Sequence, residues 1–206
     1  MGELGWELHV PRASCATVYR ALMEEGADLG VRNGGYLATG SLSLEKGYRH
    51  WHSELRCTDT PIAAGLGFTC KLKTETPFLG RAAIEAAKAQ PHKGLNGRVA
   101  CFTAGHGAEG ESRVPLHGME PLYRDGTFAG YLRSAGFGFS VDASIGYAYV
   151  FPPDGRGGDE MVSLDYLRSG AFEVESYEHG RVPARFHAKP PFDPEGRRIK
   201  GDYSGA

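Results

Sequence analysis

Residues 41–52 read Ser-Leu-Ser-Leu-Glu-Lys-Gly-Tyr-Arg-His-Trp-His, the densest mixture of apolar, charged and aromatic side chains in the chain. Leu42 and Leu44 supply apolar anchors, whereas Tyr48, Arg49 and Trp51 supply flat or charged groups that also donate hydrogen bonds. Such a rapid change from apolar to aromatic and basic residues is typical of a helix that leaves a core at the rim of a cleft. The alternative is that the leucines and Trp51 simply pack in the core, since buried apolar positions outnumber ligand contacts in any domain.

The composition is that of a globular chain large enough to bury a core. It has 206 residues, of which 41% are hydrophobic and 23% charged, and its formal net charge is −2. There is no basic surplus for nucleic acid, and no apolar run approaches the ~20 residues of a membrane span. We therefore expect neither a nucleic-acid partner nor a membrane.

The first half of the chain predicts short helices between breaks. Residues 6–10 alternate in polarity and predict a strand that stops at Pro11. Apolar residues then recur at helical spacing up to Gly26, a good helix terminator. Further helices are expected over about 36–45 and 80–89, and a further strand over 67–72.

After Gly94 the pattern changes to short β-prone runs, at 98–103, 120–123, 127–133, 145–150, 161–167, 172–176 and 182–188. The dipeptide Asp125-Gly126 lies between two of them and is a strong hairpin signal. Strands this short, with turns this frequent, predict an antiparallel barrel or sandwich. Residues 195–206 are polar and glycine-rich, so we expect a loosely held tail there.

Several motifs occur in one order along the chain. Residues 2–11 resemble the G-E-x-G-[aromatic]-E-[apolar]-x-[apolar]-P stretch of the glycine-cleavage T-protein family. Residues 41–51 resemble the S-L-x-[apolar]-E-K-G-Y-R-x-W version found in sarcosine and dimethylglycine dehydrogenases. Shorter motifs follow in the family's order, at 60–61, 64–68, 78–81, 125–130 and 189–201. The resemblance covers nearly the whole chain, and order and spacing make it specific.

The resemblance implies an α+β fold made of two parts. The first, residues 1–94, is a partial folate-binding aminomethyltransferase region, with strand–helix remnants of the family's first two domains. The second, residues 95–190, is an antiparallel Greek-key or jelly-roll-like β-barrel. Residues 191–206 form a polar tail.

The resemblance also implies a site for tetrahydrofolate. Glu7 matches the family glutamate that holds the pterin ring, and a carboxylate suits that role because its two oxygens accept from the adjacent N–H groups of the pterin edge. Tyr48, Arg49 and Trp51 are expected to line or support the opening. Without the resemblance, Glu7 reads as an exposed strand carboxylate. We predict no catalytic residue and no metal ligand, since His50 and His52 lack a convincing third ligand.

In the dehydrogenases of this family, a flavin domain oxidises an N-methyl amine, and the folate module captures the one-carbon unit as 5,10-methylenetetrahydrofolate. FAD is therefore expected only in an N-terminal domain that this chain lacks, or in a partner chain. The family's catalytic aspartate precedes anything in this chain, so the chain alone is expected to be inactive. The expected location is the mitochondrial matrix in a eukaryote and otherwise the cytoplasm.

An alternative function also remains open. The same module occurs in a regulatory subunit of pyruvate dehydrogenase phosphatase, as a binding and control element. Charged residues of the family are replaced here by Leu37, Thr39 and Gly40. These losses suit a non-catalytic regulatory or interaction module.

Overall fold

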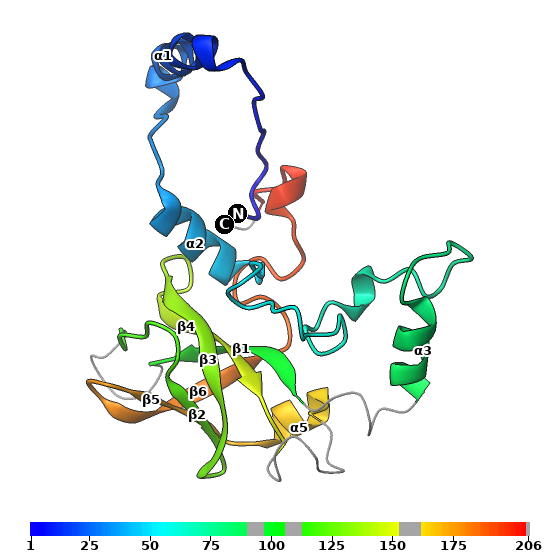
Figure 1. The fold of residues 1–206 in the computed structure, drawn as a ribbon. Helices are drawn as coiled ribbons and strands as arrows, with labels where there is room; N and C mark the ends of the chain where they lie inside the picture. Colours follow the sequence, from blue (N-terminus) through cyan, green and yellow to red (C-terminus); the bar gives the residue numbers. More distant parts are fainter. Residues whose placement is uncertain (90–96, 106–112, 153–161, 205–206) are drawn as a thin grey trace.

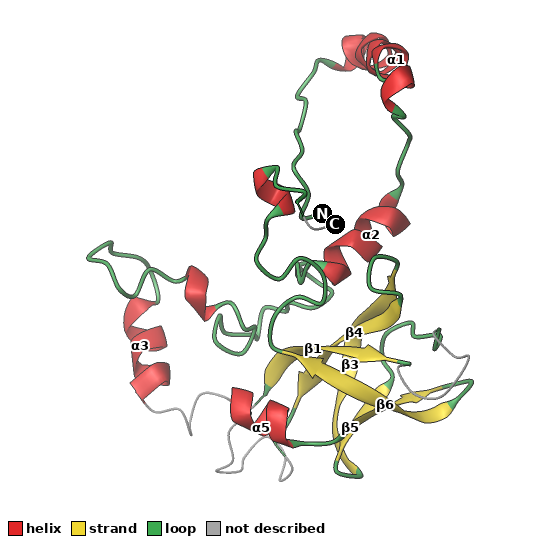
Figure 2. Cartoon of the chain, turned by 180° about the vertical axis from the view of Figure 1, so that it is seen from behind, coloured by secondary structure: helices red, strands yellow, loops and turns green. Residues whose placement is uncertain are grey.

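Six antiparallel strands close into a β-barrel in the second half of the chain (Figures 1 and 2). The computed structural model describes residues 1–89, 97–105, 113–152 and 162–204. Around the barrel the strand order is β1-β4-β3-β2-β5-β6, and β6 pairs with β1 to complete the circle. The strands are β1 (Arg98–Ala104), β2 (Pro121–Arg124), β3 (Thr127–Gly138), β4 (Ala143–Val150), β5 (Phe172–Ser176) and β6 (Gly180–His187). The predicted antiparallel barrel within an α+β fold is confirmed.

Strand β1 separates two apolar clusters because its side chains alternate between the two faces of the sheet. Ala100 and Phe102 point into the barrel, where they join a cluster that includes Leu122 and Leu132. Val99 and Cys101 point outward, into a second cluster that includes Leu44. The barrel interior is thus filled by side chains, and its outer face at β1 is covered from the first half of the chain.

The turns of the barrel follow the sequence signals, with one exception. Asp125 and Gly126 join β2 to β3 with φ angles of 51° and 78°, as a tight hairpin turn requires. The predicted strand over 161–167 is wrong for residues 164–167, because α5 (Leu164–Ser169) is a helix. The reason is local: the Ser163 side chain accepts a hydrogen bond from the Tyr166 amide (3.0 Å) and caps the helix.

The first half consists of helices joined by extended segments. Its elements are η1 (Arg12–Ser14), α1 (Cys15–Glu25), η2 (Ala27–Leu29), α2 (Tyr36–Glu45), η3 (Gly67–Thr69) and α3 (Arg81–Ala89). Helix α2 packs on the barrel at β3 and β4 and contributes Leu44 to the outer cluster. The strand predicted over 67–72 is wrong, since that segment forms η3 and turns. Among the described residues, no helix is both long and apolar enough to cross a membrane.

Residues 2–37 form an excursion away from the barrel that returns at α2 (Figures 1 and 2). Helix α1 lies where it was predicted but has no buried residue. The strand predicted over residues 6–10 is wrong, because this extended segment pairs with no other described strand. A strand needs a hydrogen-bonding neighbour, which alternation of polarity alone does not supply.

The C-terminal segment is anchored at residues 192–193, directly before the predicted loosely held tail. The Phe192 amide donates to the Glu45 carbonyl at 3.1 Å, and Asp193 forms a buried ion pair with Lys46. Further on, η4 (Arg198–Lys200) carries Arg198, whose guanidinium lies 3.7 Å from the Glu3 carboxylate. The two chain ends therefore lie next to each other beside α2 (Figure 1). The predicted boundary at residue 94 falls outside the described residues.

Candidate functional site

Helix α2 ends in a turn that points the next residues toward the barrel surface. Gly47 adopts a φ of 73°, and a Cβ there would lie 3.0 Å from Pro190 and 3.3 Å from the Tyr147 hydroxyl. Both the left-handed conformation and the close approach favour glycine at this point. The turn delivers Tyr48 and Arg49 to the rim of a cavity.

This cavity has a volume of about 570 Å³ and lies between four segments of the chain. Its walls come from residues 46–49, from the loop around Gly65, from Cys101 and Tyr147 of the barrel, and from residues 187–194. Of the four predicted ligand-binding residues, Tyr48 and Arg49 line it. We call it the Tyr48–Arg49 cavity.

The Arg49 guanidinium is the charged group within this cavity that lacks a carboxylate partner among the described residues. It lies 5.6 Å from the centroid of the Tyr147 ring, and its buried Nε has no hydrogen-bond partner in the described chain. The other two cations of the wall, Lys46 and Lys189, are paired with Asp193 and Glu195. Arg49 is therefore available for an anionic group of a ligand.

Cys101 and Tyr147 are neutral at the floor of the cavity. Burial raises the pKa of Cys101 to about 12, against smaller lowering effects of its hydrogen bond with Tyr147 and of Arg49. Burial likewise raises the pKa of Tyr147, whose hydroxyl donates to the Leu44 carbonyl at 3.2 Å. A thiol in this state is a poor nucleophile, so the pair forms a neutral, structural floor.

Glu7 and Trp51 lie outside the cavity. The Glu7 side chain is 91% exposed, and its nearest ionic neighbour is His9 at 3.8 Å. Trp51 is 58% exposed and makes an edge contact with His52. The structure thus brings together Tyr48 and Arg49 but not Glu7, because the extended segment that carries Glu7 packs against no strand.

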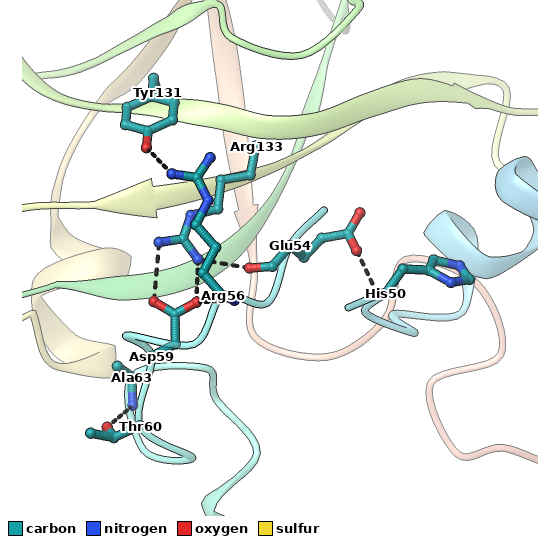
Figure 3. A network of polar contacts seen from close by, with 8 residues as sticks. All are labelled: His50, Glu54, Arg56, Asp59, Thr60, Ala63, Tyr131 and Arg133. Atoms are coloured by element: carbon teal, nitrogen blue, oxygen red, sulfur yellow. Dashed lines mark hydrogen bonds and ion pairs between the residues drawn. The ribbon is translucent and has the colours of Figure 1, made fainter. Parts of the chain in front are cut away.

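A polar network ties the loop after Trp51 to the barrel (Figure 3). Arg133 of β3 pairs with Asp59, both side chains being 4% exposed, and donates to the Glu54 carbonyl at 2.7 Å. The buried Glu54 carboxylate accepts from the His50 amide, and Arg56 donates to the Tyr131 hydroxyl at 2.9 Å. This network fixes the backbone directly after Arg49.

Sequence reasoning missed the members of this network. Asp59 and Arg133 are 74 residues apart, and neither lies in a motif that predicts burial. The one available signal was Arg133 itself, a charge at the end of an otherwise apolar and aromatic β-prone run. Such a residue inside a barrel strand needs a buried partner.

Comparisons with known proteins agree on one family. The model described as GCVT N-terminal domain matches residues 1–74, and the model described as Glycine cleavage T-protein C-terminal barrel domain matches residues 98–193. A solved aminomethyltransferase T of the glycine cleavage system from Bartonella henselae superposes with a TM-score of 0.68 at 20% identity, covering 90% of this chain and 45% of that one. This similarity shows the shared fold.

Curated relatives are much longer than this chain. Human mitochondrial sarcosine dehydrogenase is 49% identical over 98% of the chain, which covers 21% of that protein. Rat mitochondrial dimethylglycine dehydrogenase is 36% identical over 72% of the chain and 16% of that protein. The mouse mitochondrial regulatory subunit of pyruvate dehydrogenase phosphatase is 31% identical over 91% of the chain and 20% of that protein. The chain thus spans about a fifth of the length of these relatives.

Proposed function

The chain belongs to the glycine cleavage T-protein family, whose two domain models match well over half of it between them, and from that premise we propose that it binds tetrahydrofolate as part of an aminomethyltransferase-like module. In a longer protein of the sarcosine or dimethylglycine dehydrogenase type, this module captures a one-carbon unit released by oxidation of an N-methyl amine. FAD belongs to the region that performs the oxidation, and mitochondrial relatives favour a mitochondrial location.

The observation that carries the proposal is the Tyr48–Arg49 cavity. Its volume of about 570 Å³ falls in the range of small-molecule sites, roughly 300–1,000 Å³. It combines apolar walls from Leu66, Phe68 and Pro190 with the unpaired guanidinium of Arg49. A folate has a flat heterocycle and carboxylates at opposite ends, so these residues fit its carboxylate end, where Arg49 supplies a charge-assisted pair.

To bind the pterin ring at the other end of tetrahydrofolate, the site needs a second segment of the chain. Glu7 supplies the right acceptor pair, and we propose that its segment lies over the cavity in the longer protein. In support, large apolar side chains of this segment are exposed here, among them Trp6 at 81% and Leu8 at 59%. Apolar surface of this extent is normally covered by another part of a protein. The partner is therefore the preceding part of the module, together with the flavin region.

Isothermal titration calorimetry with tetrahydrofolate tests this function. We expect wild-type chain to bind, and Arg49→Gln to weaken binding by about tenfold or more, as loss of a charge-assisted hydrogen bond predicts. Glu7→Gln is expected to weaken binding in the longer protein, where its segment is covered. Arg12→Gln and Glu24→Gln are matched controls, because both residues are exposed and far from the cavity along the chain.

The regulatory alternative predicts a different outcome. It is favoured by the 31% identity with the phosphatase regulatory subunit and by the exposed Leu37, which stands where the family carries a charge. Absence of tetrahydrofolate binding, by both the chain and the longer protein, would favour this alternative. Binding that Arg49→Gln leaves unchanged would contradict the cavity as the folate site.

The isolated chain is proposed to be catalytically inactive. Proton handling by a placed carboxylate contributes about 10²–10⁴ in rate, and the family's catalytic aspartate matches no position here. Formation of 5,10-methylenetetrahydrofolate by the purified chain would overturn this part of the proposal.

A further inference from the structure

A second cavity lies next to the first and is lined by cations. Its volume is about 670 Å³, and it lies between residues 62–74, Lys88 of α3 and the start of β1. Figure 1 shows α3 and the η3 segment standing to one side of the barrel. Four positively charged side chains line this cavity, and no acidic side chain is among its described lining residues: Lys71, Lys73, Lys88 and Arg98.

These four cations differ from most others in the described chain. Lys46, Arg81, Arg133 and Lys189 each have a carboxylate within ion-pair distance, as do several more. Within the part of the chain that the structure describes, none of the four cations of the second cavity forms an ion pair or a side-chain hydrogen bond. The nearby acid on α3, Glu85, is already paired with Arg81 at 2.8 Å.

The two cavities meet at Gly65, and a guanidinium lines each of them: Arg49 the first and Arg98 the second. Gly65 and Phe68 line both cavities, and a Cβ on Gly65 would lie 3.3 Å from an Arg49 nitrogen. Burial and, after it, the charge of Arg49 lower the pKa of Arg98. Partly buried like charges without a counter-ion are unfavourable, so an anion placed here would relieve both groups.

We propose that the second cavity is a binding site for a small polyanion, a ligand that carries two or more carboxylate or phosphate groups. Arg98 engages one such group with its planar pair of donors, and the three lysines act as point charges for the others. The site goes beyond the tetrahydrofolate proposal, because none of its four cations lines the Tyr48–Arg49 cavity, and it stands even if folate does not bind.

Calorimetry with simple probes tests the site in the full 206-residue chain at physiological salt. Tripolyphosphate and citrate are the probes, and inorganic phosphate is the comparison with a single anionic group. We expect a polyanion to bind more tightly than phosphate, and Lys71→Gln with Lys73→Gln to weaken its binding by about tenfold or more. Both lysines are exposed, so the double variant is expected to fold. Preference for tripolyphosphate assigns phosphates to the site, and preference for citrate assigns carboxylates.

The control is Lys200→Gln with Arg168→Gln, which removes two charges outside this cavity. Equal weakening by the control would mean attraction by net charge alone and would overturn the proposal. So would no binding of either probe. Arg98→Lys keeps the charge but loses the planar donor pair, and is expected to weaken binding less than Arg98→Gln. Arg49 is unchanged in every variant, so failure here is distinct from failure of the folate test.

Discussion

At the scale of single residues, the Arg133–Asp59 pair is the contact on which the site most depends. Both side chains are 4% exposed, and the same guanidinium donates to the Glu54 carbonyl in the loop that follows Arg49. Its ring contact with Tyr149, 4.1 Å from guanidinium carbon to centroid, fixes it further. Removing one partner of such a pair leaves the other charge buried without compensation.

We therefore expect Arg133→Met to lower the free energy of unfolding by about 3–5 kcal/mol, as measured by urea denaturation. The double variant with Asp59→Asn should be less destabilised than Arg133→Met alone, because it leaves no buried charge. Arg168→Met is the control: its pair with Asp165 is exposed, and such pairs contribute about 0–1 kcal/mol. Equal losses in the two single variants would contradict a special role for Arg133.

At the scale of elements, Asp193 is the acid that ties the C-terminal segment to the end of α2. Asp193 pairs with Lys46 and also accepts from the amides of Arg197 at 2.8 Å and Arg198 at 3.1 Å. The hydrogen bond from Lys46, and after it those two amides, lower the pKa of Asp193 from 3.8 to about 2.

A folded-state pKa below the unfolded value stabilises the protein above about pH 4, and this stabilisation is lost as the pH falls toward 2. We expect the urea midpoint of wild type to fall more steeply between these pH values than that of Asp193→Asn. Asp165→Asn, at an exposed carboxylate, should keep the wild-type slope. Parallel slopes for wild type and Asp193→Asn would refute this anchoring role.

Elements were predictable where the signal was local. Asp125-Gly126 predicted its hairpin from two residues, and the β-prone run over 98–103 predicted β1 itself, although not which of its side chains fill the barrel. The cap at Ser163 was equally local but was overlooked in a β-prone run. Residues 6–10 show the opposite case, because their alternation predicted a strand, whereas the segment is extended but pairs with no other described strand. For the candidate site, the motif predicted Tyr48 and Arg49, which line the cavity, whereas Asp59 and Arg133 depend on a contact across 74 residues.

At the scale of the whole molecule, the excursion over residues 2–37 exposes a large apolar surface. Its most exposed members include Trp6 at 81%, Leu29 at 84% and Leu37 at 92%. Single exposed apolar residues are ordinary, but so many of them on one segment indicate an interaction surface or a tendency to aggregate.

The purified chain is therefore expected to self-associate with rising concentration in sedimentation velocity experiments. Changing Trp6, Leu29 and Leu37 together to Gln should shift it toward monomer. Tyr177→Gln is the control, because this residue is fully exposed on the β5–β6 hairpin, away from the excursion. A wild-type chain that stays monomeric at every concentration would show that this surface does not associate.

The first and last described residues lie close together, which affects how the chain can be inserted into another sequence. Leu4 lies against Gly201, and Glu3 against Arg198, so both ends leave the molecule at one place. Chains whose termini meet tolerate circular permutation and insertion into a host sequence. Residues 3–201 thus begin and end at adjacent points in space, so their insertion between two neighbouring residues of a host loop needs only short linkers.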